Sequence, residues 1–155
     1  MLEGIKKLHF VGIGGVGMSA IAEVMLDKGY EISGSDLSES AVVKHLKAKG
    51  ATIYKGHDAL NVEGKEALVL SSAIHQDNPE LVAAKAKGLK LFHRSDILAY
   101  LLNDAKGIAV AGAHGKTTTS SMISVVLEHA KVDPTILIGG FVDYLKGNAK
   151  LGKSD

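Results

Sequence analysis

The stretch LHFVGIGGVGMSAIAE (residues 8–23) decides the fold, because its hydrophobic pattern changes partway along. Residues 8–13 are a short apolar run, which is typical of a buried strand. Several glycines then interrupt the run. Beyond them, apolar residues recur at helical spacing, at Met18, Ile21, Ala22, Met25 and Leu26. The stretch therefore predicts a buried strand, a tight glycine turn and a helix in succession.

The same alternation continues along the chain. Further strands are predicted at residues 30–36, 51–54, 67–73 and 89–92, and further helices at 38–50, 78–88 and 95–102. Strands that alternate with helices form a parallel sheet with right-handed crossovers. We therefore predict an α/β fold, with a Rossmann-like, doubly wound parallel sheet over residues 1–103.

A second unit is predicted after a polar joint, NDAKG (residues 103–107). Its elements are a strand at 108–112, a helix at 116–129 and a strand at 135–140, followed by a polar tail without a core-facing period. Three elements are too few to close a core, so residues 104–155 are expected to be the truncated start of another domain. We expect the helix to pack on the first domain or on a neighbouring copy of the chain, by self-association.

Composition narrows the classes of partner. The chain has 155 residues, a formal net charge of +1 and no cysteine. The charge gives no bias toward nucleic acid or an anionic membrane, and His9, Glu23 and the glycines break the only long apolar run. We expect neither a nucleic-acid nor a membrane partner. The absence of cysteine excludes disulfides and thiol chemistry and fits a cytoplasmic location.

The first glycine turn matches G-x-G-x-x-G at Gly12, Gly14 and Gly17, with Gly15 as an extra glycine. Glycines let the backbone approach a diphosphate, and the following helix start complements its charge. Asp36 ends the next strand, where a carboxylate can accept hydrogen bonds from a ribose. This pattern fits a nicotinamide or flavin dinucleotide, a nucleotide-diphosphate sugar, or a turn that only serves packing.

The second turn lies in VAGAHGKTTTSS (residues 110–121), between a predicted strand and a predicted helix. It is a shortened phosphate loop, since Val110 stands where the usual spacing needs its first glycine. Lys116 can reach the β- and γ-phosphates of a nucleotide, and the Thr117 hydroxyl can ligate Mg²⁺. For His114 a structural role is favoured over a phosphate contact. The remaining histidines are predicted to be unpaired, without a metal site.

Together, HFVGIGGVGMSAIAE, GSD, SSAI…NPEL and AGAHGKTTT resemble the Mur ligases of peptidoglycan synthesis. The resemblance implies that the first domain binds a UDP-sugar and that the second is an ATPase using Mg²⁺. The implied UDP-sugar residues are Gly14, Gly15, Gly17, Ser35, Asp36, Ser71, Ser72, Ala73, His75 and Arg94. The implied ATP loop (112–118) consists of Gly112, Ala113, His114, Gly115, Lys116, Thr117 and Thr118, with Lys116 and Thr117 catalytic and Thr117 on the metal.

The double-glycine form GIGGVGM implies the family member that joins L-alanine to UDP-N-acetylmuramate through an acyl phosphate. Because family members have about three domains, we expect this chain to be an N-terminal fragment that binds the UDP-sugar without turnover. Three alternatives stay open: a muropeptide-recycling ligase of the same family, an NAD-dependent oxidoreductase, and a non-catalytic nucleotide-sensing module.

Overall fold

The computed structural model describes residues 1–154. Its main body is a five-stranded parallel sheet built from β1 (Lys7–Val11), β2 (Glu31–Asp36), β3 (Thr52–Lys55), β4 (Ala67–Leu70) and β5 (Lys90–His93). The strands lie in the order β3-β2-β1-β4-β5. The direction of this order reverses between β1 and β4, which is the point where doubly wound sheets open a crevice at their carboxyl ends.

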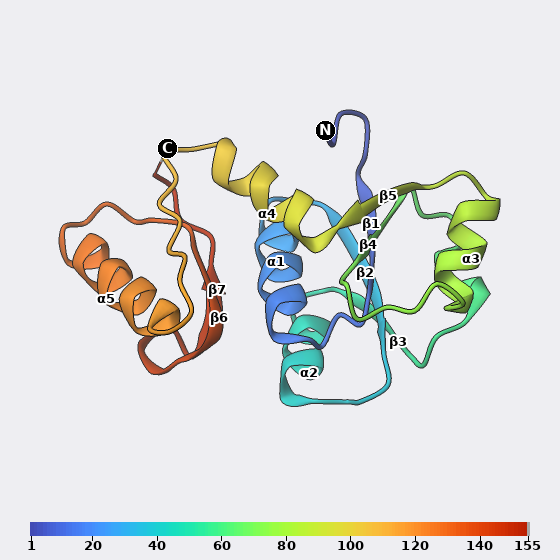
Figure 1. The fold of residues 1–155 in the computed structure, drawn as a ribbon, viewed down its shortest axis with the longest axis horizontal. Coiled ribbons are helices and arrows are strands. Elements are labelled where there is room, and N and C mark those ends of the chain that lie inside the picture. The colour runs from blue at the N-terminus through green and yellow to red at the C-terminus, as the bar shows by residue number, and fades with distance from the viewer. Residues whose placement is uncertain (155) are drawn as a thin grey trace.

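Helices cover both faces of the sheet (Figure 1). One face carries α1 (Val16–Asp27), α2 (Ala41–Ala48) and α4 (Arg94–Asn103), and the other carries α3 (Pro79–Ala86) and a 3₁₀ turn at Ala59–Val62. The larger core buries Leu8, Phe10 and Ile13 against Met25 and Ile97. Every strand and helix predicted for this body is confirmed, so the fold class is an α/β parallel sheet.

Local signals set where α3 begins. The Asn78 side chain accepts hydrogen bonds from the N–H groups of Glu80 and Leu81, and Pro79 occupies the first helical turn. Both features satisfy or remove N–H groups that the first turn would otherwise leave without an acceptor. This cap matters for the site because it places Glu80 at the inner side of the helix start.

The second unit differs from its prediction in three ways. Its elements are α5 (Lys116–His129) and an antiparallel hairpin of β6 (Ile136–Val142) and β7 (Gly147–Lys150). The predicted strand at 108–112 is wrong: these residues run as a coil toward α5 (Figure 1). A strand needs a neighbour for its hydrogen bonds, and the described sheets offer this segment none.

The prediction that the polar tail has no core-facing residues is wrong. Ala149 of β7 is buried against Ala20 and Val24 of α1, and the neighbouring Asn148 donates to the Val16 carbonyl at 2.8 Å. The hairpin therefore joins the second unit to α1, whereas α5 packs on β6 rather than directly on the first body.

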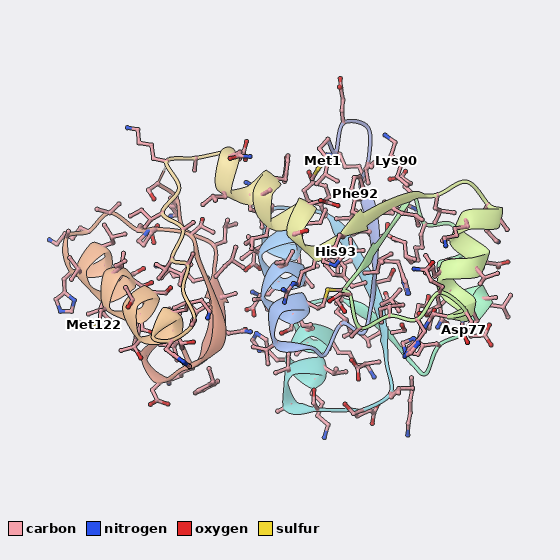
Figure 2. The ribbon with its side chains drawn as sticks, viewed as in Figure 1. Met1, Asp77, Lys90, Phe92, His93 and Met122 are labelled. Carbon is pink, nitrogen blue, oxygen red and sulfur yellow. The ribbon has the colours of Figure 1, made fainter. Side chains whose placement is uncertain are left out.

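The face of α5 that the sequence pattern assigned to a core is mostly open. Met122 and Val126 are each 65% exposed, and Figure 2 shows Met122 on the outer side of the helix. Of the residues in α5, only Ser124 is buried. Within residues 1–154, no helix combines the length and apolar character needed to cross a membrane.

Candidate functional site

The first glycine turn, which we call the first bend (residues 12–17), connects β1 to α1. Gly12 has a φ of +73°, a conformation that only glycine adopts without strain. The N–H groups of Gly12 and Ile13 both donate to the Ser35 carbonyl, at 2.9 and 3.0 Å. No side chain caps α1, and the first N–H groups of a helix have no intrahelical acceptor. The bend is thus fixed to β2 while the helix start stays open to an anion.

Asp36 braces this bend. Its Oδ2 accepts the Gly14 N–H at 2.8 Å, and its Oδ1 accepts the backbone N–H and the hydroxyl of Ser38. A carboxylate offers about four acceptor positions, so one remains for a ligand. A Cβ at Gly14 would lie 2.8 Å from Asp36 Oδ2, so a side chain there would push Asp36 away from the bend.

Arg94 comes to the first bend from the far side of the crevice. It follows β5 as the first residue of α4, next to His93, which Figure 2 labels at this junction. The His93 N–H donates to Asp96 Oδ2 at 2.7 Å, and the His93 ring accepts from the Ser95 N–H, so the start of α4 is firmly capped. The Arg94 guanidinium lies where a Cβ on Gly17 would be. This places a permanent cation against the first turn of α1.

The segment after β4 completes the same edge. Ile74 lies above Gly12, with its Cδ1 3.6 Å from where a Cβ would stand. Around it, Ser71 is half-buried, and Ser72, Ala73 and His75 are exposed. The tertiary structure thus brings residues predicted from four strand ends to one crevice. Whether each contacts a ligand stays a prediction.

Ser35 has a different environment from the one its position suggested. Its side chain is fully buried, and its hydroxyl donates to Glu80 Oε2 at 2.6 Å on the α3 face of the sheet. Because this hydroxyl is buried, it can affect a ligand only indirectly, through the side chains hydrogen-bonded around Glu80.

Glu80 is the centre of a buried polar cluster that sequence reasoning missed. Its carboxylate, with no exposed surface, accepts from His9 Nε2 at 3.3 Å and from the Asn61 side chain at 2.7 Å. His57 Nδ1 lies 3.0 Å from Oε2. Two of the histidines predicted to be unpaired therefore share one carboxylate. The only sequence signal was the position of Glu80 in the first turn of a capped helix. An acidic residue there is normally explained by its favourable interaction with the helix dipole.

The cluster holds a charge inside the protein. Burial by itself raises the pKa of the Glu80 carboxyl, but hydrogen bonds from His9, Ser35, Asn61 and His57 outweigh it and bring the pKa down to about 2. Among residues 1–154, no buried side-chain nitrogen or oxygen lacks a hydrogen-bond partner. A satisfied network of this kind makes the sheet beneath the crevice rigid.

The second glycine turn, which we call the second bend (residues 112–117), is built less firmly. Gly115 has a φ of +77° and precedes α5 without a side-chain cap, and every residue from Ala111 to Thr119 is exposed. Lys116 Nζ donates to the carbonyls of Gly112 and Ala113, at 2.5 and 3.2 Å. The Lys116 ammonium group is therefore drawn back onto its own loop.

The hydroxyl run after the second bend divides into two groups. Ser121 and Ser124 donate to backbone carbonyls one turn earlier in α5, which is how such residues are accommodated inside a helix. Thr117 and Thr118 stand in the first turn with exposed side chains, and Thr117 Cγ2 lies 3.3 Å from where a Cβ on Gly140 of β6 would be. Hydroxyl oxygens of this kind suit Mg²⁺, so the oxygen donors at the start of α5 fit the expected ion.

A cavity of about 580 Å³ lies beside the second bend. Lys116, Thr117 and Ile123 line it together with residues of α4, the 104–110 coil and β6. The structure also contains no group of three or more His, Asp or Glu residues within residues 1–154 that is arranged to hold a metal ion.

Comparison with known proteins adds an independent result. Residues 7–106 match the model of the Mur ligase family, catalytic domain. The chain is 56% identical over 153 residues to the UDP-N-acetylmuramate–L-alanine ligase of Hydrogenobaculum sp. (strain Y04AAS1). That match covers 99% of this chain and 34% of the relative, so the chain spans about a third of the length of such relatives.

Solved structures agree with the sequence comparison. The UDP-N-acetylmuramate-alanine ligase MurC of Thermotoga maritima superposes with a TM-score of 0.88 at 36% identity, covering 94% of this chain and 35% of that one. A UDP-N-acetylmuramate:L-alanyl-γ-D-glutamyl-meso-diaminopimelate ligase from Neisseria meningitides gives 0.88 at 32% identity, covering 96% and 47%.

Proposed function

The chain belongs to the Mur ligase family, and on that premise we propose that it is the N-terminal part of a ligase that joins L-alanine to UDP-N-acetylmuramate. The five-stranded body binds the UDP-sugar, and the second unit contributes the phosphate loop for ATP. ATP and nucleotide sugars are intracellular metabolites, so we place the enzyme in the cytoplasm.

One observation carries the first half of this proposal: a single crevice edge combines the open start of α1 with the Arg94 guanidinium. An anion at this point gains from the helix dipole, from backbone N–H groups and from a fixed cation. The diphosphate of the UDP-sugar is therefore bound over Gly15 and Gly17, with the nucleoside toward the end of β2.

The reaction proceeds by two substitutions. A carboxylate oxygen of the muramate attacks the γ-phosphorus of ATP, which gives an acyl phosphate and releases ADP. The amine of L-alanine then attacks the acyl carbon, phosphate leaves, and the amine loses a proton to give the amide. Both steps move negative charge between oxygens, so catalysis depends on fixed positive groups near the phosphates.

In the second bend, Lys116 supplies that positive charge. Its ammonium group leaves the carbonyls of Gly112 and Ala113 and turns to the β- and γ-phosphates when ATP binds. Thr117 would offer its hydroxyl oxygen to Mg²⁺, which would neutralise phosphate charge when bound.

The muropeptide-recycling ligase is the alternative within the family, and its solved relatives have the same fold. The relatives at 50–56% identity over nearly the whole chain are L-alanine ligases, which favours the first reading. The full-length protein supplied with L-alanine or with a tripeptide distinguishes the two by phosphate release. Nucleotide binding without phosphate release, whichever acceptor is supplied, would support the sensing module instead.

Calorimetric titration of the 155-residue chain tests the binding half directly. UDP-N-acetylmuramate and UDP are expected to bind, and NADH is expected to give no heat and no fluorescence enhancement. Arg94→Ala serves as the variant, since it removes the guanidinium above the bend, and Lys90→Ala is a matched loss of one exposed cation elsewhere. NADH binding without UDP binding would replace the ligase proposal with the oxidoreductase.

A further inference from the structure

The buried cluster around Glu80 has a surface-facing member, His57, which follows β3 at the carboxyl edge of the sheet. The Gly56 N–H donates to the Asp36 carbonyl at 2.8 Å. This bond and the 3.0 Å separation between His57 Nδ1 and Ser35 Oγ place His57 beside the end of β2, where a Rossmann-type crevice takes the ribose of its nucleotide.

Hydrogen bonding determines which nitrogen of the His57 ring carries the hydrogen. Ser35 Oγ has one hydrogen and gives it to Glu80 Oε2 at 2.6 Å. His57 Nδ1 lies 3.0 Å from both the Ser35 hydroxyl and Glu80 Oε2. A carboxylate only accepts, and this hydroxyl has no hydrogen left to donate, so Nδ1 carries the hydrogen and donates to both.

The other ring nitrogen is left for a ligand. His57 is one-fifth exposed, and its Nε2 makes no hydrogen bond within the described chain. Since no buried side-chain nitrogen there lacks a partner, Nε2 lies at the surface. A neutral ring with Nδ1–H presents a lone pair at Nε2, which accepts from a hydroxyl. Asp36 has already committed three of its acceptor positions to the protein.

We propose that His57 is a binding residue that accepts a hydrogen bond from a ribose hydroxyl of the UDP-sugar, and that the buried Glu80 is the positioning residue that keeps its proton on Nδ1. This inference rests on the proposed function, because it assumes that a uridine nucleotide occupies the crevice. It assigns the Glu80 cluster a part in recognition as well as in stability.

Two substitutions separate the two ring nitrogens. His57→Asn keeps an N–H near the Nδ1 position, so Glu80 and Ser35 retain their donor and the chain folds, but it removes Nε2. His57→Gln places an amide near the Nε2 position instead. His45→Ala is the matched control, since His45 is an exposed histidine paired with Glu23 on the opposite face.

The probes are UDP and its 2′-deoxy and 3′-deoxy forms, titrated by calorimetry. His57→Asn is expected to weaken UDP about tenfold, the worth of one hydrogen bond at a partly desolvated site, and His57→Gln to weaken it less. At least one deoxy form is expected to bind the original chain and His57→Asn equally. Equal losses for all three probes would overturn the ribose contact, whereas a chain that binds none of them would remove the proposed function itself.

The positioning part has its own readout. Nitrogen-15 NMR of the unsubstituted chain is expected to show hydrogen on Nδ1 of His57 in the neutral ring. Glu80→Gln, which removes the anionic acceptor, is expected to shift this ring toward the Nε2–H form and to reduce UDP affinity together with it. A His57 ring that keeps its Nδ1–H form in Glu80→Gln would show that Glu80 acts on stability alone.

Discussion

The two glycine bends have similar sequences, but they differ in exposure and in the hydrogen bonds that hold them to neighbouring strands. The first follows a central strand, is bonded to Ser35 and Asp36 of the neighbouring strand, and sits above a fully bonded buried cluster. The second follows a coil, is exposed from Ala111 to Thr119, and bonds mainly to itself through Lys116. Glycines and a helix start make an anion site conceivable, but adjacent strands are what hold its N–H groups in place before a ligand arrives.

The largest expected effect comes from removing the charge beneath the first bend. Glu80→Gln replaces a carboxylate that only accepts with an amide whose NH₂ group cannot accept, and losing hydrogen bonds to a buried charged group costs about 2–3 kcal/mol at neutral pH. Urea unfolding measures this loss. Glu39→Gln is the control, because Glu39 is an exposed carboxylate paired with Lys47, and it is expected to leave the unfolding free energy unchanged.

The same pair of variants has a defined pH dependence. The pKa of Glu80 is about 2 in the folded chain and 4.5 as a free side chain. A carboxyl group with a lowered pKa in the folded chain stabilises the fold at pH values above its unfolded-state pKa. This contribution is lost as the pH falls through the folded-state pKa. The difference corresponds to about 3 kcal/mol. The gap between the original chain and Glu80→Gln is therefore expected to shrink between pH 4.5 and 2; a constant gap would contradict a charged Glu80.

A loss of stability of intermediate size is expected when one glycine of each bend is replaced by alanine. Gly12→Ala and Gly115→Ala both place a side chain at a φ above +70°. The first bend is bonded on both sides and cannot relax, so Gly12→Ala is expected to cost about 1–2 kcal/mol. The exposed second bend can shift its backbone, so Gly115→Ala is expected to cost less than about 0.5 kcal/mol. Thermal unfolding of the two variants side by side checks this, and equal losses would refute the difference in support.

The smallest effect concerns the charged side chain that touches each bend. Asp36→Ala removes the acceptor of the Gly14 N–H and is expected to cost about 1 kcal/mol and to shift the Gly14 amide resonance. Lys116→Ala removes only exposed contacts, with an expected change within about 0.5 kcal/mol. Asp36→Asn, which keeps a carbonyl acceptor, is the control. A Lys116 variant less stable than the Asp36 variant would reverse the comparison.

Much of the first body could be predicted because its signals are local. Asn78 and Pro79 marked the start of α3, the glycines at 12–17 marked a strand-to-helix turn, and periodicity separated strands from helices. The Glu80 cluster could not be predicted in this way. His9 and Glu80 are 71 residues apart, and neither has neighbours in the sequence that distinguish a buried, hydrogen-bonded side chain from a solvated one.

In the second unit as well, the local sequence did not predict which segments form strands. IAVAG (108–112) has the composition of a buried strand, yet it forms none, since a strand exists only when another strand accepts its hydrogen bonds. GNAK (147–150) is polar and glycine-containing, yet it pairs with β6 and buries Ala149 against α1.

The amino-acid sequence by itself determined the alternation of strands and helices, the two glycine turns and the family, because periodicity, caps and glycine spacing act over a few residues. Only the tertiary structure decided which turn is held rigid, that Asp36 is largely occupied by the protein, and that a buried carboxylate stands behind His57. Those outcomes depend on which distant strands become neighbours and on how much water they exclude, and no short stretch of chain contains that information.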